Sequence, residues 1–238
     1  MPDLGPLNYV GRLTGAKLHE GMESGDGFVT FECEGEDALL EAAQQYGMVM
    51  PHRDADARGI THLRDIPELG PKRGVGLSKA ALLPHTDRPA IKRPPRVLLL
   101  WCSRASSDGG DAVVMRGTDV VARLGELDPS ALKAFCEPDA AIFRTKNDEF
   151  TGPVFHLEGG LLTEVRLRFD PLAYYYVDAA RRMPALERAL RETELAFPLR
   201  PGTGYALRND LWLHGRRAYA GDRETKRIMI EDKHPARA

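Results

Sequence analysis

The sequence predicts a mainly β protein with a few inserted helices, in the class of sandwiches, jelly rolls and barrels. Two observations predict this class. Short apolar runs recur along the 238 residues, and Gly and Pro separate them. These runs do not alternate with helical patterns, which disfavours a doubly wound parallel sheet. The expected strands cover residues 27–33, 96–102, 111–116, 140–145, 161–169, 203–208 and 227–231.

Three segments carry helix signals. Residues 36–47 have acidic residues at the start and end on Gly47. Residues 128–137 open with Asp128 as the expected N-cap and a proline at the first helical position. Residues 184–197 also begin with a proline and place apolar side chains on one face. We expect all three helices to pack against a sheet.

No internal repeat, low-complexity tract or linker divides the chain, so we expect residues 1–238 to form a single domain. Residues 50–79 are rich in Gly, Pro and charge, which predicts a long loop. Loops of that length in compact domains are usually functional or mobile.

The overall charge and the chain ends restrict the partners. The formal net charge is −2, and Lys and Arg are spread along the chain, which argues against a nucleic-acid partner. No segment has the length and apolarity of a signal peptide or a membrane span, so we expect a cytoplasmic protein with a small-molecule partner and no membrane partner. The three cysteines are widely spaced and are expected to be free thiols. The sequence does not indicate an oligomeric state.

Two His-x-Asp pairs are candidate metal ligands. His52 and Asp54 lie in the charged segment, and His85 and Asp87 lie in a proline-containing turn just before an apolar run. In an extended segment the side chains of residues two apart project to the same face, so each pair can bind one ion. Such a pair arises easily by chance, and a complete site needs a third ligand.

The best third ligand for the pair at 85 and 87 is His214, with His156 as the alternative. Two imidazoles and one carboxylate on one face of an Fe(II) ion leave coordination positions open for a cosubstrate and oxygen. An acidic cosubstrate also needs a cation, and Arg227 is the candidate because a guanidinium can bind a carboxylate through two hydrogen bonds. We expect a turn at "AGDR" to bring the strands of His214 and Arg227 together. The alternative for Arg227 is a surface salt bridge with Glu224 or Asp222.

Three stretches together, "LPHTDR", "DGGDAVVMRG" and "GYALRNDLWLHGRRAYAGDRETKRIMIED", resemble the signature series of the taurine dioxygenase and clavaminate synthase-like family of Fe(II)- and 2-oxoglutarate-dependent oxygenases. The resemblance extends from about residue 26 to the carboxyl terminus. It implies a double-stranded β-helix, or jelly roll. It also implies that His85, Asp87 and His214 bind iron and that Arg227 binds the far carboxylate of 2-oxoglutarate.

The resemblance further implies a reaction in which 2-oxoglutarate and O2 are consumed, succinate and CO2 are released, and a small polar substrate, such as an amino acid derivative, is hydroxylated or otherwise oxidised. Residues 50–79 would then form part of the wall or lid of the active site. Arg166 and Arg168 lie two residues apart in an expected strand and share a face, so they are candidates for lining the substrate cavity.

Two positions depart from the family pattern. Many relatives have a Thr where this chain has Ala112, and some have a second Arg where this chain has Glu231. These departures keep open a cupin-like metalloenzyme that does not use 2-oxoglutarate. A non-catalytic jelly-roll binding protein is a third hypothesis, and it predicts no stoichiometric iron.

Overall fold

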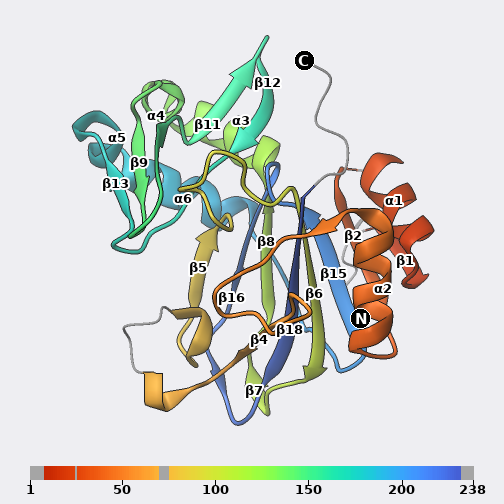
Figure 1. The fold of residues 1–238 in the computed structure, drawn as a ribbon. Helices are drawn as coiled ribbons and strands as arrows, with labels where there is room; N and C mark the ends of the chain where they lie inside the picture. Colours follow the sequence, from red (N-terminus) through yellow and green to blue (C-terminus); the bar gives the residue numbers. More distant parts are fainter. Residues whose placement is uncertain (1–7, 25, 70–74, 232–238) are drawn as a thin grey trace.

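The computed structural model describes residues 8–24, 26–69 and 75–231. Two β-sheets dominate it, and helices lie on either side of them (Figure 1). The larger sheet runs in the order β1 (Asn8–Arg12), β2 (Phe28–Glu32), β15 (Thr203–Arg208), β6 (Val97–Arg104), β18 (Glu224–Glu231) and β3 (Met48–Val49), with β4 (Thr61–Arg64) also paired to β18. The smaller sheet runs in the order β14 (Leu195–Phe197), β8 (Ala112–Arg116), β16 (Trp212–Arg216) and β5 (Leu82–His85).

One hydrophobic core lies between the inner faces of these sheets. It contains Leu98 and Met229 from the larger sheet and Val114 and Trp212 from the smaller one. Side chains along a strand alternate between its faces, so residues two positions from these also face inward. This alternation directs His214, two residues after Trp212, toward the interior.

The outer face of the larger sheet is covered by α1 (Gly15–Ser24) and α2 (Glu36–Tyr46). Val97, Leu99 and Ile228 point to this side and form a second core with apolar residues of the two helices. Helix α2 begins and ends as the sequence predicts, and the N–H of Gly47 donates to the Ala43 carbonyl at the end of the helix.

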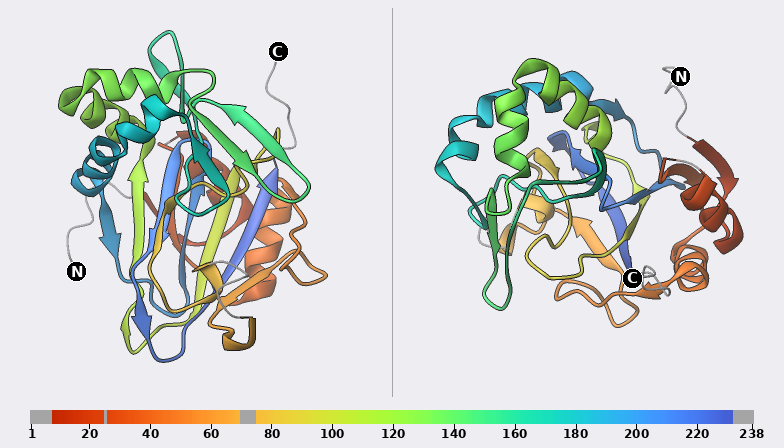
Figure 2. Two further views of the ribbon diagram at one scale, coloured as in Figure 1. Left: turned by 90° about the vertical axis from the view of Figure 1, so that its left-hand side faces the viewer. Right: turned by 90° about the horizontal axis from the view of Figure 1, so that it is seen from above.

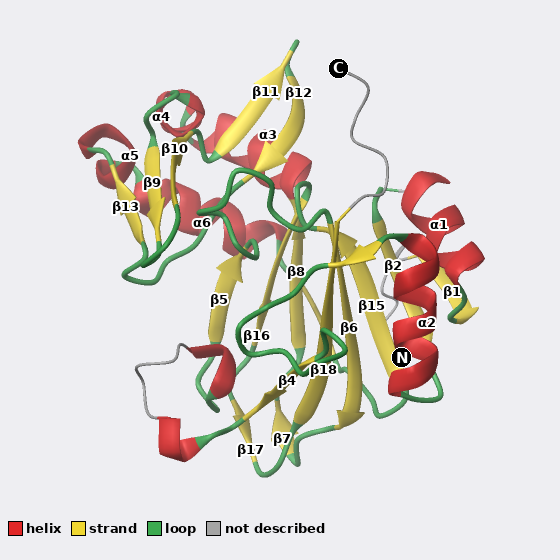
Figure 3. Ribbon diagram, in the orientation of Figure 1, coloured by secondary structure: helices red, strands yellow, loops and turns green. Residues whose placement is uncertain are grey.

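The outer face of the smaller sheet is covered by helices and small sheets from the middle of the chain (Figures 2 and 3). Met115 and Leu213 point to this side. The helices are α3 (Gly117–Leu127), α4 (Pro129–Cys136), α5 (Val177–Arg181) and α6 (Met183–Thr193). The small sheets on this face consist of β10 (Glu149–Gly152), β9 (Ala141–Arg144) and β13 (Ala173–Tyr175), and of β11 (Phe155–Glu158) and β12 (Leu161–Val165). A further pair, β7 (Asp108–Gly109) and β17 (Tyr219–Ala220), lies at the opposite end of the molecule (Figure 3).

The mainly β class with inserted helices is confirmed, and the seven expected strands all overlap strands of the structure. Asp128 caps α4 as predicted, because its carboxylate accepts from the N–H groups of Ser130 and Ala131. The three cysteines are free thiols, as expected. Among the described residues, no helix has the length and apolarity needed to span a membrane.

Three boundaries predicted from the sequence are wrong. The predicted helix 184–197 ends at Thr193, because residues 195–197 pair with β8 as strand β14. The predicted strand 161–169 ends at Val165, where its pairing with β11 stops. The segment 50–79 is not a loop throughout, because residues 61–64 form β4 on the edge of β18, and short 3-10 turns cover 67–69 and 75–77.

Candidate metal centre

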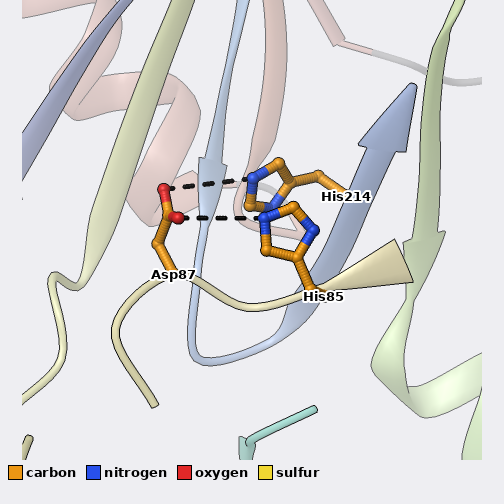
Figure 4. Close-up of side chains that lie close together, drawn as sticks. All are labelled: His85, Asp87 and His214. Atoms are coloured by element: carbon orange, nitrogen blue, oxygen red, sulfur yellow. Dashed lines mark ion pairs between the residues drawn. The ribbon is translucent and has the colours of Figure 1, made fainter. Parts of the chain in front are cut away.

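Two antiparallel strands of the smaller sheet bring the candidate ligands together. His214 lies on β16 directly opposite His85, the last residue of β5. The two imidazole rings are 4.3 Å apart between centroids. Asp87 follows β5 by two residues and turns back toward both rings (Figure 4). The sequence-predicted triad is thus assembled at one end of the interior between the sheets.

The ligand atoms are close enough to share one ion. The Nε2 of His85 lies 3.8 Å from one oxygen of Asp87, and the Nε2 of His214 lies 4.0 Å from the other. These distances are too long for hydrogen bonds. Two atoms that each bind a metal at about 2.1 Å are at most about 4.2 Å apart, so both distances suit a shared ion. His214 and Asp87 are buried, and one potential ligand atom from each of the three residues lies within 4.8 Å of the others.

The protonation states also fit a metal. The Nδ1 of His85 is 2.9 Å from the Leu83 carbonyl, which can only accept, so Nδ1 carries the proton and the Nε2 lone pair is free. Burial lowers the pKa of His85, and burial together with the neighbouring His85 lowers the pKa of His214 to about 3. Burial alone would raise the pKa of Asp87, but Arg227 and the two histidines hold it well below its usual range. At neutral pH the triad therefore offers two neutral imidazoles and one carboxylate, the state that binds metal.

Asn209 fixes the backbone at Asp87, a role that the sequence did not reveal. Its Oδ1 accepts from the N–H of Asp87 at 2.7 Å, and its Nδ2 donates to the carbonyls of Asp87 and Pro95 at 3.1 and 2.9 Å. Asn209 is itself buried. The amide thus ties the loop after β5, which carries Asp87, to the turn before β16, the strand that carries His214.

Arg227 reaches the triad from the opposite sheet. It lies on β18, two residues before the inward-facing Met229, and its Nη1 donates to both oxygens of Asp87 at 3.0 and 2.9 Å. The turn at "AGDR" joins β17 to β18, but it does not bring the strands of His214 and Arg227 together as expected, because β16 and β18 belong to different sheets. The alternative of a surface salt bridge is also wrong, since Arg227 pairs with Asp87 and Glu224 pairs with Lys226.

Arg223 and Thr225 are two polar residues that sequence reasoning missed. Thr225 lies on β18 two positions before Arg227, so strand alternation indicates a shared face, and Arg223 lies just before the strand begins. Arg223 is 8% exposed and has no carboxylate partner among the described residues, and burial lowers its pKa. The Thr225 hydroxyl is buried and also lacks a hydrogen-bond partner within the part of the chain that the structure describes. The spacing of Arg223 and Arg227 is visible in "DRETKR" and was the available signal.

Tyr205 is a buried polar residue of the interior between the sheets. It is fully buried on β15, and its ring belongs to the core between the sheets. Burial raises its pKa, and the charges of Arg223, Asp87 and Arg227 all act on it. The Arg223 guanidinium itself lies 5.7 Å from the centre of the Tyr219 ring.

The two arginines after β12 behave differently from each other. Arg166 is buried, stacks on Phe150, and donates to the carbonyls of Pro89, Ile91 and Lys92 at 2.9, 2.8 and 3.1 Å. It thereby holds the loop that follows Asp87, so its guanidinium has a structural role. Arg168 pairs with Asp170, and its charge acts on His85. His156 is exposed on β11 and is not part of the group formed by the triad.

Comparison with known proteins gives a family match. A family model described as taurine catabolism dioxygenase TauD, TfdA family matches residues 8–229. The uridine-5'-phosphate dioxygenase of an Amycolatopsis species is 29% identical over 147 residues, which are 57% of this chain and 54% of that protein. The gamma-butyrobetaine dioxygenase of Homo sapiens is 28% identical over 161 residues, 61% of this chain and 42% of that protein. The chain thus spans about half the length of these curated relatives.

Solved structures share the fold at low sequence identity. An asparagine oxygenase (AsnO) is 16% identical, with a TM-score of 0.76 over 92% of this chain and 78% of that one. The non-heme iron oxygenase OrfP, solved with Fe and alpha-ketoglutaric acid, is 16% identical, with a TM-score of 0.65 over 86% of this chain and 74% of that one.

Proposed function

This chain belongs to the taurine catabolism dioxygenase TauD, TfdA family, and from that premise we propose that it is a non-haem Fe(II)- and 2-oxoglutarate-dependent dioxygenase. It oxidises a small polar substrate and releases succinate and CO2. The observation that carries the proposal is the convergence of His85, Asp87 and His214 at the inner face of the smaller sheet, with an arginine at hydrogen-bond distance from the carboxylate. The resemblance seen in the sequence is confirmed at the level of the family.

We propose that the two facing sheets form a double-stranded β-helix and that residues 1–238 make up one oxygenase domain. The core shared between the sheets and the likeness to iron oxygenase structures support this assignment. Of the expected wall segment 50–79, we propose that β4 contributes to the active-site wall, because it pairs with the strand that carries Arg227.

In this proposal His85, Asp87 and His214 hold the iron. The free lone pair on the His85 Nε2 and the neutral His214 support that role. Bound Fe(II) supplies redox chemistry and open coordination positions for the cosubstrate and O2. The protein's own part is to fix the two imidazoles by strand pairing and the carboxylate by Asn209.

Arg227 and Arg223 are proposed to hold the two carboxylates of 2-oxoglutarate. The family resemblance implies that Arg227 binds the far carboxylate, but Arg227 contacts Asp87 directly, so we assign it to the carboxylate nearer the metal, which it can bind once Asp87 is a metal ligand. Arg223 lacks an acidic partner among the described residues and suits the far carboxylate. The buried Thr225 hydroxyl offers a donor in place of the Thr missing at Ala112. A second cation is thus available four residues before Arg227, rather than at Glu231.

We propose Arg168 as a binding residue for the prime substrate, since the residue before it, Leu167, is hydrogen-bonded to Thr86, which lies between His85 and Asp87. Arg166 is the second candidate for substrate binding, but its guanidinium is already bound to carbonyl groups and to Glu164. Solved relatives hold hydroxylated asparagine or hydroxylated arginine, which supports an amino acid derivative as the substrate class.

The decisive experiment is an anaerobic titration of the protein with Fe(II) and 2-oxoglutarate, followed by the visible metal-to-ligand charge-transfer band. We expect the band in the unaltered protein and its loss in His214→Ala. Arg223→Met should form the band only at higher 2-oxoglutarate concentration. Tight iron binding without the band would favour the cupin-like metalloenzyme, and absence of stoichiometric iron binding would favour the non-catalytic protein.

A further inference from the structure

The second His-x-Asp pair, which the triad does not use, lies beside the candidate site. The segment that carries this pair is hydrogen-bonded to β18 at both of its ends. At its start, the N–H of Met50 donates to the Met229 carbonyl at 2.8 Å. At its end, Thr61 pairs with Arg227 of the same strand. Residues 51–60 therefore loop out beside the strand position that presents Arg227 to Asp87.

His52 is held in this segment with one ring nitrogen free to donate. Its Nδ1 accepts from the N–H of Asp54 at 3.2 Å, so Nε2 carries the proton of the neutral ring. Nε2 has no acceptor among the described residues. Burial lowers the pKa of His52, and the charges of Arg227, Asp87 and Arg88 all act on it. The carbonyl of Pro51, the residue before His52, accepts a hydrogen bond from Arg88, so the segment that carries the ring lies beside the residue that follows Asp87.

Arg88 is the residue directly after Asp87, and its backbone is in an unusual conformation. Its φ is 54°, the only positive φ of a non-glycine residue in the described part of the chain. A residue with a Cβ rarely adopts this left-handed region. The backbone is fixed on both sides, by Asn209 at Asp87 and by Arg166 at Pro89. Strained residues held in this way by their surroundings cluster at functional sites.

The Arg88 side chain carries a charge that no acid compensates within the described residues. Its Nη1 donates to the Pro51 carbonyl at 3.3 Å, which brings the guanidinium to the start of the His52 segment. Arg227 and Arg168, the two arginines whose charges act on His85, each face a carboxylate, that of Asp87 and that of Asp170. A partly buried cation beside a neutral N–H donor favours an anion as ligand.

We propose that Arg88 and His52 together bind an anionic group, a carboxylate or a phosphate, of the prime substrate, and so hold its remaining atoms over the triad. This inference rests on the proposed function and narrows its substrate class to small acids. Both residues lie outside the group of proposed iron and cosubstrate ligands. Arg88 is therefore a specificity-determining residue rather than a part of the metal centre.

The test uses the protein loaded anaerobically with Fe(II) and 2-oxoglutarate, so that the cosubstrate site is filled. Acetate and methyl phosphate are then titrated by calorimetry, and the two probes distinguish a carboxylate site from a phosphate site. We compare the unaltered protein with Arg88→Asn, since Asn tolerates the left-handed conformation. Arg88→Lys keeps the charge, and Arg93→Gln removes an exposed arginine from the same loop as a matched control.

We expect one of the two anions to bind the unaltered protein, and Arg88→Asn to weaken that binding by about tenfold to a hundredfold. Arg88→Lys should restore part of the affinity, His52→Gln should lower it, and Arg93→Gln should leave it unchanged. The inference is overturned if neither anion binds, or if Arg88→Asn binds the anion as tightly as the unaltered protein. The charge-transfer band separates the two proposals: its absence defeats the proposed function, whereas its presence with an ineffective Arg88→Asn defeats only this inference.

Discussion

Replacing Arg227 by Met should destabilise the metal-free protein strongly and the Fe(II)-loaded protein much less. The Nη1 of Arg227 makes two charge-assisted hydrogen bonds to Asp87, and the two side chains are only 12% and 10% exposed. Removing one partner of such a buried pair costs about 3–5 kcal/mol, because the other charge stays buried and uncompensated. Asp87 can relieve part of this cost by taking up a proton, so we expect a loss of about 3 kcal/mol. For a protein of this size that corresponds to a fall in Tm of about 6–12 °C.

A bound metal ion changes this result, since its charge compensates Asp87 in place of the guanidinium. The assay is urea denaturation of Arg227→Met and the unaltered protein, with chelator and with anaerobic Fe(II). Arg93→Met, at an exposed arginine, controls for the loss of a surface charge and should change the free energy of unfolding by less than about 0.5 kcal/mol. A loss of the same size with and without Fe(II) would show that the ion does not take over Asp87, and the reasoning would be refuted.

Three further predictions concern groups away from the iron ligands. Asp128→Ala should lower the free energy of unfolding by about 1 kcal/mol in urea denaturation, because α4 loses its N-cap, whereas Asp128→Asn should retain most of it. Lys226 is hydrogen-bonded to Glu224 and forms an ion pair with Glu36. These contacts lower the pKa of Glu36, and they lower the pKa of Glu224 although burial alone would raise it. The stabilisation is thus present above the ordinary carboxyl pKa of 4.5 and is lost as pH falls through the lowered values. In urea denaturation, Lys226→Met should therefore lower the free energy of unfolding at neutral pH and change it little in acid. An equal loss at the two pH values would contradict this. Arg166→Met should speed amide hydrogen exchange in residues 88–95 and weaken Fe(II) binding, because three carbonyls of that loop lose their donor; unchanged exchange there would argue against this structural role.

The metal centre could be predicted from the sequence because its ligands lie in short, chemically distinctive patterns. His85 and Asp87 are two residues apart, so local extended geometry alone places them on one side. His214 and Arg227 were found through the same C-terminal stretch that carries the family resemblance. These residues can be recognised without knowledge of the sheet topology, because binding a metal or a carboxylate restricts the residue types at these positions.

The route by which distant residues meet was not predictable. Arg227 was expected on a strand paired to that of His214, yet the two strands lie in facing sheets. A hairpin and a sandwich can bring the same side chains together, and only long-range strand pairing distinguishes them. The same limitation explains β14, whose three residues continue a helical pattern in sequence but pair with β8 in the structure.

By itself, the sequence determined the mainly β class, the family and the residue types at the metal centre, because periodicity and short motifs are local properties. Only the tertiary structure decided what the buried polar groups do. In the tertiary structure Asn209 and Arg166 hold the loop around Asp87, and the buried Thr225 hydroxyl has no hydrogen-bond partner among the described residues. Arg88 contacts the backbone next to His52, far from it in the sequence. The reason is physical: a polar side chain takes its role from the groups that burial brings within reach, and those groups are far away along the chain.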